Sequence, residues 1–329
     1  MQSQPEQYPA VDFAKFMLAF VIIGIHTTVF AQFKWLDMGF DVFSRIAVPF
    51  FFAASGFFFF KKPVTRPNCA RFAKRILILY LIYSVIFLTI SSCMQSGFDS
   101  DIVFRTLISG YRHLWFLHAL LIGMMLAACL IHFIKKTWIV YLIAALFLIF
   151  RYFMTTMWPL LASVNALIPI HDFCGDHLVL GFWNALFYAF PFIAVGHKLA
   201  TARHQLSRIG CIAAILGAFT LLGAETYISS AILHTDSRIL YLACVPLVYF
   251  SFQLCQQIAW PGNSGVSLFF RKTSTMIYCI HPAFILLMMD RISQGLVMFA
   301  IVSLCAFAFA IFVYWGTHYR WGRWMRYLL

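Results

Sequence analysis

Long apolar stretches, separated by short polar ones, make up almost the whole chain. Since roughly 20 apolar residues cross the hydrocarbon core of a bilayer, about ten of these stretches predict membrane-spanning helices. They are rich in Leu, Ile and Phe and lack the alternation of a β-barrel, so we expect an all-α, polytopic membrane protein. The predicted spans are residues 11–31, 44–60, 75–94, 113–134, 137–152, 179–199, 208–230, 238–258, 273–290 and 295–318.

Composition and charge agree with this division. Of the 329 residues, 63% are hydrophobic and 11% charged, which leaves too little polar surface for a soluble globule. Of the 24 Lys and Arg residues, sixteen fall in segments on the inner side, seven on the outer side, and Lys15 within the first span. This bias places both termini in the cytoplasm, and it explains the net charge of +13 without a nucleic-acid partner. We expect one membrane domain, residues 1–329, with a retained first span and no appended soluble domain.

The first predicted span carries ionisable residues on one helical face. Lys15 and His26 are eleven residues apart, which at 100° per residue leaves them within about 20° of the same direction. Asp12 lies one turn before Lys15 and can pair with it, and Lys15 can extend to the inner surface. His26 lies about 16 Å farther along the axis, so it must face the bundle interior or a hydrated cavity. It either exchanges protons or bridges two helices by hydrogen bonds.

A basic segment, RPNCARFAKR at residues 66–75, precedes the third predicted span on the inner side. If the helix begins early, Arg71, Lys74 and Arg75 lie within about one turn of one another. The segment is either an ordinary positive-inside loop that contacts lipid headgroups or a clamp for a polyphosphate. A cytoplasmic coenzyme A thioester or a nucleotide would suit the second alternative.

The second predicted span lies within RIAVPFFFAASGFFFFKK, residues 45–62. Pro49 removes a backbone donor and predicts a kink. Ser55 and Gly56 narrow the helix, which either lets a neighbouring helix approach or leaves a broken helix beside a cavity. Arg45, at the outer start of this segment, is a secondary candidate for the site.

Two more polar residues lie inside predicted spans. Glu225 is in the seventh span, where a carboxyl must be protonated, paired or exposed to a hydrated path, and His26 or an arginine is its expected partner. His281 directly precedes Pro282, which removes a helical hydrogen bond, and both a structural and a catalytic role are open for it.

The outer segments carry weaker signals. His113 and His118 flank Trp115 at the mouth of the fourth span, where interfacial packing is the default and His118 a secondary candidate. The cluster HDFCGDH at residues 171–177 has no recognised metal spacing, and the scattered cysteines form no C-x-x-C pair, so we expect no metal.

Several segments together resemble the membrane-bound acyltransferase-3 family, which includes O-acetyltransferases of bacterial surface polysaccharides and peptidoglycan. They occur in the family's order and cover most of the chain. The branch that supplies the membrane domain of vancomycin-resistance serine racemases looks closest, especially in RIAVPFFF. The matching segments are DFAKFMLAFVIIGIH, RIAVPFFFAASGFFF, the basic stretch before YLIYSVIF, HLWFLHALLIGMML, NALFYAFPFIAVGHKLA and IYCIHP.

The resemblance implies a core of about ten helices that moves an acyl group, usually acetyl, from cytoplasmic coenzyme A to an acceptor on the outer face. His26 matches the family's first-span histidine, Lys15 the basic residue before it, and Ser55 the Ser-Gly-Phe element. The family's Arg-x-x-Arg coenzyme motif maps onto residues 71–74. Here Lys74 replaces the second arginine, which keeps the charge but loses bidentate phosphate geometry. Many members carry a soluble esterase-like domain, whereas transfer here is expected to finish within the membrane domain.

These inferences form one hypothesis. In a bacterial cytoplasmic membrane, the phosphates of acyl-coenzyme A bind Arg71, Lys74 and Arg75, and the pantetheine arm enters the bundle. His26, tuned by Glu225, activates a hydroxyl or amine of an envelope glycan or lipid-linked sugar, or carries the acyl group itself. The alternatives are a proton-coupled carrier, for example of serine, in which His26 and Glu225 form the relay, and a noncatalytic scaffold.

Overall fold

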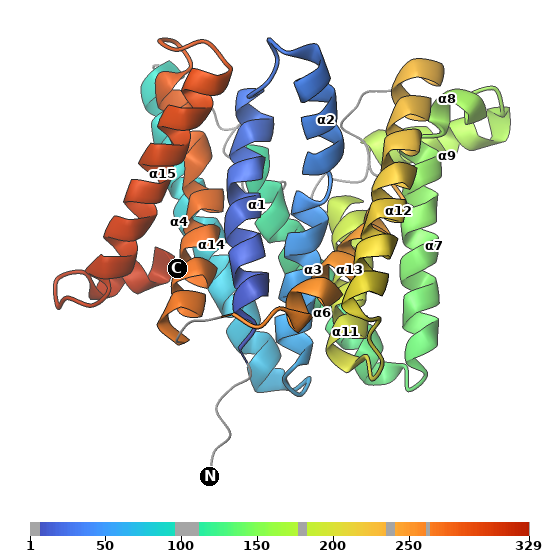
Figure 1. Cartoon of the computed structure of the whole chain (residues 1–329), viewed down its shortest axis with the longest axis horizontal. Helices are drawn as coiled ribbons and strands as arrows, with labels where there is room; N and C mark the ends of the chain where they lie inside the picture. Colours follow the sequence, from blue (N-terminus) through green and yellow to red (C-terminus); the bar gives the residue numbers. More distant parts are fainter. Residues whose placement is uncertain (1–6, 96–111, 177–182, 235–240, 261–263, 329) are drawn as a thin grey trace.

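The computed structural model describes residues 7–95, 112–176, 183–234, 241–260 and 264–328, and every regular element within these ranges is a helix (Figure 1). The α-helices are α1 (Pro9–Thr27), α2 (Lys34–Ser44), α3 (Ala47–Phe60), α4 (Arg66–Gln95), α6 (Trp115–Phe133), α7 (Thr137–Thr155), α8 (Trp158–Leu161), α9 (Ile168–Asp176), α11 (Phe190–Thr201), α12 (Arg208–Tyr227), α13 (Cys244–Gln257), α14 (Ser264–Met288) and α15 (Leu296–Gly316). Short 3-10 or π segments are η1 (Arg112–Leu114), η2 (Asn165–Leu167), η3 (Ala185–Ala189), η4 (Ile228–Ile232) and η5 (Arg323–Leu328).

Seven helical segments within the described ranges are long and apolar enough to cross a membrane. They are α1, α2 joined to α3, α4, α6, α7, α12 joined to η4, and α15. The segment formed by η3 and α11 is apolar but shorter. The all-helical membrane class is therefore confirmed, whereas the number of ten spans and the cytoplasmic position of both termini stay predictions.

The observed boundaries differ from the predicted ones at the start of the chain. α1 ends at Thr27 rather than at residue 31, because Thr28 adopts a left-handed conformation with φ 46° and its N–H bonds back to the last turn. Helix α2 was not predicted, because the polar residues within it are typical of a loop outside the membrane. α4 begins at Arg66, well before the predicted residue 75, which confirms the early start on which the basic segment depends.

The predicted kink at Pro49 is wrong. α3 begins at Ala47, so Pro49 lies in the first helical turn, where its missing N–H has no intrahelical partner to lose. The chain turns instead at Arg45 and Ile46, between α2 and α3.

Two glycines allow α3 and α11 to pack closely. A Cβ at Gly56 would lie 2.5 Å from the carbonyl oxygen of Ile193, and a Cβ at Gly196 would lie 2.7 Å from the backbone nitrogen of Phe57. Apolar burial does not draw helices together in lipid, so close backbone packing at small residues supplies much of the association. The alternative in which Ser55 and Gly56 permit helix contact is the one the structure shows.

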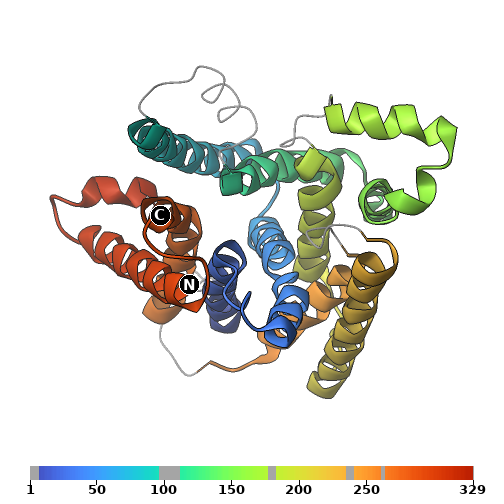
Figure 2. The same ribbon diagram turned by 90° about the horizontal axis from the view of Figure 1, so that it is seen from above.

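The helices form a bundle in which several helices begin at the same end. α1, α4 and α14 begin at one end, and α15 returns to it (Figure 1). Viewed along the bundle, α1 and α3 lie near the middle, while α7, α12 and α15 lie toward the edge (Figure 2). Because α1 packs against α14 along its length, Lys15 and His26 lie toward opposite ends of one helix pair.

Candidate active site

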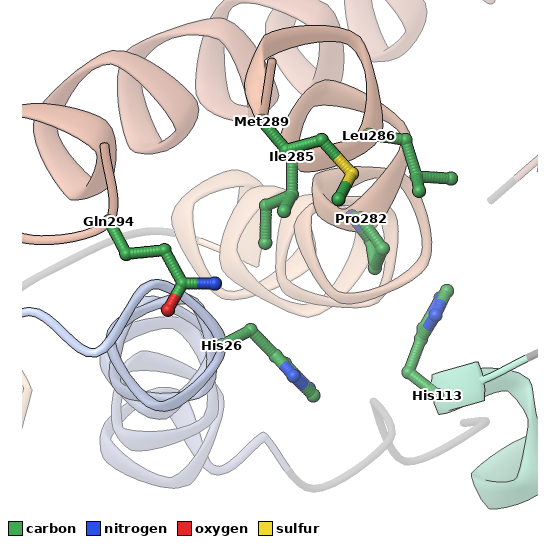
Figure 3. A pocket seen from close by; sticks show the side chains of 7 residues that line it. All are labelled: His26, His113, Pro282, Ile285, Leu286, Met289 and Gln294. Atoms are coloured by element: carbon green, nitrogen blue, oxygen red, sulfur yellow. The ribbon is translucent and has the colours of Figure 1, made fainter. Parts of the chain in front are cut away.

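A cavity of about 100 Å³ lies where α1 and α14 end, large enough for several water molecules or part of a substrate. His26 and His113 extend into it from different elements, and one face of α14 forms the apolar wall (Figure 3). We call it the histidine cavity. Its lining residues are His26, His113, Pro282, Ile285, Leu286, Met289 and Gln294.

His26 occupies the last turn of α1, and its side chain is exposed in the cavity. The loop between α14 and α15 is tied to this helix end. The hydroxyl of Thr28 donates to Oε1 of Gln294 at 3.1 Å, and the N–H of Gly295 donates to the carbonyl of Thr27 at 2.9 Å. Of the two environments expected for His26, the structure therefore shows the cavity.

His281 lies buried beside His26, with the two ring centroids 5.3 Å apart. Its Nδ1 is 2.8 Å from the carbonyl oxygen of Tyr278 and 3.1 Å from that of Ile277. Carbonyls only accept, so Nδ1 carries the proton and Nε2 is an acceptor. Pro282 explains the arrangement: it has no N–H to give to Tyr278, four residues earlier, and the imidazole takes that place. Nε2 of His281 is buried without a hydrogen-bond partner among the described residues.

His113, from η1, completes a group of three imidazoles. Its ring centroid lies 5.4 Å from that of His281. Nε2 of His113 is 3.2 Å from the carbonyl oxygen of Cys279, so this nitrogen is the donor, and the hydroxyl of Tyr278 donates to the backbone carbonyl of His113 at 2.8 Å. These bonds hold His113 against α14. Because an imidazole can accept or donate a proton, this group is suited to general acid–base chemistry.

Cationic side chains gather toward the other end of α1. Asp12 is fully buried, with its carboxylate 2.8 Å from Nη2 of Arg271 and 2.6 Å from the hydroxyl of Ser267. The expected ion pair of Asp12 with Lys15 is thus replaced by one with Arg271, although Lys15 interacts electrostatically with Asp12, Arg271 and Arg75. We call Lys15, Arg75 and Arg271 the inner cationic cluster, after the cytoplasmic side on which the sequence predicts this end of α1 to lie.

Lys15 is buried rather than extended to the surface, with Nζ 5.9 Å from the ring centroid of Phe51. The Phe51 ring lies 6.1 Å from that of Tyr278, which in turn lies 6.1 Å from the ring of His281. Aromatic contacts therefore connect the inner cationic cluster with the histidine cavity.

The basic segment before the third predicted span divides into two parts. Arg71, Lys74 and Arg75 are all exposed, and Nη1 of Arg71 donates to Oδ1 of Asn68 at 3.1 Å. Arg75 interacts with Arg271 and Lys15 and so belongs to the inner cationic cluster. The early start of α4 thus brings Arg75, whose side chain is exposed, into electrostatic range of the buried Lys15.

Glu225 lies away from the histidine cavity. One carboxylate oxygen accepts from the N–H of Leu242 at 3.3 Å and the other from that of Ala243 at 2.9 Å. These are unpaired donors at the start of α13, so Glu225 anchors that helix. The expected pairing of Glu225 with His26 or an arginine is therefore corrected to backbone amides and the hydroxyl of Tyr152.

The remaining candidates also have structural contacts. The hydroxyl of Ser55 donates to the carbonyl of Phe51 within α3 at 2.8 Å. Arg45 pairs with Asp41 at 2.6 Å, and His118 packs against Tyr80 with ring centroids 6.0 Å apart. Over the parts of the chain that the structure describes, no group of three His, Cys, Asp or Glu could hold a metal ion.

The sequence did not identify two of the residues that line the histidine cavity. His113 was interpreted as an interfacial residue, and Gln294 was not noticed. The position of His113 in the site could not be predicted, because no sequence pattern shows that η1 packs against the middle of α14. Gln294 lies in a loop whose position depends on how α14 and α15 meet α1.

Fold and cavity together define a multi-helix membrane protein with a histidine-lined site at one end of its first span. Residues 8–326 match the acyltransferase-3 family, described as an acyltransferase domain, and the chain belongs to this family. No solved structure matches the chain significantly.

Two curated relatives carry other names. The chain is 26% identical over 284 residues to an amino-acid racemase of Enterococcus faecalis, covering 79% of this chain and 37% of that protein. It is 28% identical over 261 residues to a serine/alanine racemase of Enterococcus gallinarum, covering 72% of this chain and 35% of that protein. The chain thus spans about a third of the length of these relatives.

Proposed function

We propose that this membrane acyltransferase moves an acyl group, acetyl in the simplest case, from cytoplasmic acyl-coenzyme A to a hydroxyl of an acceptor on the outer face of a bacterial cytoplasmic membrane. An envelope glycan or a lipid-linked sugar would be the acceptor. The observation that carries the proposal is the arrangement on α1, with a cationic cluster toward one end and a histidine cavity at the other. The eleven residues from Lys15 to His26 correspond to about 16 Å of helix, the distance that a pantetheine arm has to cover.

The inner cationic cluster is suited to the phosphates of the donor. Lys15, Arg75 and Arg271 carry three positive charges against the single carboxylate of Asp12. Such an excess at the edge of a low-dielectric bundle calls for anionic ligands. Arg71 and Lys74 extend the positive surface outward along α4.

At the other end, His26 acts as the general base. Its imidazole takes the proton of the acceptor hydroxyl, and the oxygen attacks the thioester carbonyl carbon. The C–O bond forms, the C–S bond breaks, and the coenzyme A thiolate leaves and receives the proton from His26. The C-terminal end of α1 favours the positive charge that His26 carries during the reaction.

His281 and His113 position and stabilise this group. Because the Nδ1 proton of His281 is committed to backbone carbonyls, its Nε2 lone pair is fixed beside the His26 ring and favours the protonated state that forms there. The hydrogen bond from His113 to the carbonyl of Cys279 holds the opposite wall of the cavity.

The test uses sealed membrane vesicles that contain the protein and its envelope acceptors. Vesicles receive radiolabelled acetyl-coenzyme A on the cytoplasmic face, and alkali-labile label in the glycan fraction is counted. We expect His26→Ala to abolish incorporation and His281→Ala to reduce it strongly. Removing a general base costs typically 10²- to 10⁴-fold in rate.

His132→Ala is the matched control, because His132 is exposed at the far end of α6. It should transfer label at the wild-type rate. Thermal melting of each purified variant establishes that the fold is retained. Wild-type incorporation by folded His26→Ala protein would refute the proposal.

A second candidate function is a carrier for a small amino acid such as serine, and the racemase names of the two relatives favour it. The two candidates differ in the ligand that stabilises the native state. Acetyl-coenzyme A should raise the melting temperature of a transferase, and serine that of a carrier.

A further inference from the structure

A second polar cluster lies apart from the histidine cavity, around Arg151 near the end of α7. Nη1 of Arg151 donates to Oδ1 of Asn184 at 2.7 Å, and its guanidinium lies 4.9 Å from the ring centroid of Tyr188 and 5.8 Å from that of Trp183. No carboxylate among the described residues forms an ion pair with Arg151. An arginine within a membrane-spanning helix is expensive unless a negative group compensates it.

Arg45 contributes a second guanidinium to the same cluster. Its side chain is 13% exposed, and it pairs with Asp41 at 2.6 Å. The guanidinium lies 5.5 Å from the ring centroid of Tyr241, and Tyr188 interacts electrostatically with both Arg45 and Arg151. Tyr188 thus interacts with both arginines, with Arg45 at the junction of α2 and α3 and with Arg151 on α7.

Three donors in this cluster are buried without a hydrogen-bond partner among the described residues. They are Nε of Arg45, Nε of Arg151 and the hydroxyl of Tyr241, whose side chain is completely buried. Glu225 does not satisfy them: it accepts from the N–H groups of Leu242 and Ala243, and none of the three atoms has a partner among the described residues. Buried polar groups are nearly always paired, so three unsatisfied donors in one place indicate a missing acceptor.

We propose that Arg45, Arg151 and Tyr241 form a binding site for an oxyanion, a carboxylate or phosphate group carried by a small polar molecule. The Nε–H groups of both arginines and the phenol O–H match the acceptor oxygens of such a group. The charge of Arg151, which pairs with no carboxylate in the described part of the chain, supplies the net attraction.

This oxyanion site is distinct from the histidine cavity. Trp115, two residues after His113, stacks on Tyr188 with ring centroids 6.0 Å apart, and Phe52 packs against both rings. Arg45, Arg151 and Tyr241 are not among the residues that line the histidine cavity. Binding at the oxyanion site therefore does not depend on the proposed acyl transfer.

The test is thermal melting of detergent-purified protein at constant ionic strength. The probes are glucuronate and inorganic phosphate, with glucose as the neutral counterpart of glucuronate. We expect a melting temperature that rises with the concentration of at least one anion and does not respond to glucose. Response to glucuronate alone assigns a carboxylate, and response to phosphate alone assigns a phosphate.

Tyr241→Phe tests the site without removing a structural bond. Because the hydroxyl has no partner among the described residues, the unliganded variant should melt at or above the wild-type temperature, while its anion affinity falls about tenfold. Arg151→Met should abolish the response, and Tyr227→Phe, on an exposed side chain of α12, should leave it unchanged. His26→Ala should bind the anion normally, which separates this proposal from the transferase. Melting curves unaffected by either anion, or a Tyr241→Phe variant that binds like wild type, would overturn it.

Discussion

Replacement of Gly56 by alanine tests whether the contact between α3 and α11 holds the bundle together. The new Cβ would lie 2.5 Å from the carbonyl oxygen of Ile193 and 3.1 Å from its Cα. Ordinary contact begins near 3.4 Å, so the two backbones must separate by about 0.9 Å, the difference between these distances. Backbone atoms of a helix cannot rotate away as a side chain can.

The energetic effect follows from this displacement. Overpacking of a dense interface costs typically 1–3 kcal/mol, and rigid backbone on both sides places Gly56→Ala toward the upper end. A gap of 0.5–1 Å also forfeits a quarter to a half of the dispersion energy of neighbouring pairs. The helix propensity of alanine returns up to about 1 kcal/mol. We therefore expect a net destabilisation of about 2 kcal/mol.

Intrinsic fluorescence melting in detergent measures this effect, since nine tryptophans report on the fold. The comparison is made at one heating rate, because membrane-protein unfolding is often irreversible. Gly217→Ala is the matched control, as a Cβ on this α12 glycine meets nothing within 4 Å. Gly217→Ala should melt at or slightly above the wild-type temperature and Gly56→Ala several degrees below it. Equal melting temperatures for the two variants would show that the close approach contributes nothing.

Three other variants separate structural roles from functional ones. Asp12→Ala should lower the free energy of unfolding by about 1–3 kcal/mol, because it leaves Arg271 without its carboxylate. The partial exposure of Arg271 limits this loss, and an unchanged melting curve would contradict the prediction. Glu225→Ala should lower the free energy of unfolding by about 1–2 kcal/mol, because the N–H groups at the start of α13 lose their acceptor, while the folded fraction still transfers the acyl group. Complete loss of transfer without loss of stability would show that Glu225 is catalytic. Arg75→Ala should weaken coenzyme A binding more than Arg71→Ala in a fluorescence titration, since only Arg75 joins the inner cationic cluster, and equal effects would contradict this assignment.

Much of the architecture was predictable because the bilayer imposes it. Long runs of Leu, Ile and Phe left only helices as the regular structure. The third span was predicted to begin at residue 75, whereas α4 already begins at Arg66, within the basic segment. Helix α2 was missed because Asp37 and Asp41 interrupt its apolar pattern. The sequence predicted a kink at Pro49, whereas the chain turns at Arg45. A proline can be seen in the sequence, but the sequence does not show that this proline lies in the first turn of a helix.

The site was predictable where the relevant spacing lies within one helix. The relation of Lys15 to His26 depends on helical geometry alone, and both residues lie where that geometry places them. The partners of Glu225 could not be found in this way, because backbone amides carry no side-chain signature. His113 and His281 meet only through the packing of η1 on α14, and that depends on contacts between residues more than 160 positions apart.

The hydrogen bond of His281 to Tyr278 gives the adjoining proline a chemical consequence. An ordinary residue at position 282 would offer its own amide to that carbonyl, and the imidazole would then be free to exchange its proton between both nitrogens. With Pro282 the backbone itself selects the tautomer, so one nitrogen always presents a lone pair toward the neighbouring ring. An amino acid without any titratable group thus determines which nitrogen of His281 can accept a hydrogen bond.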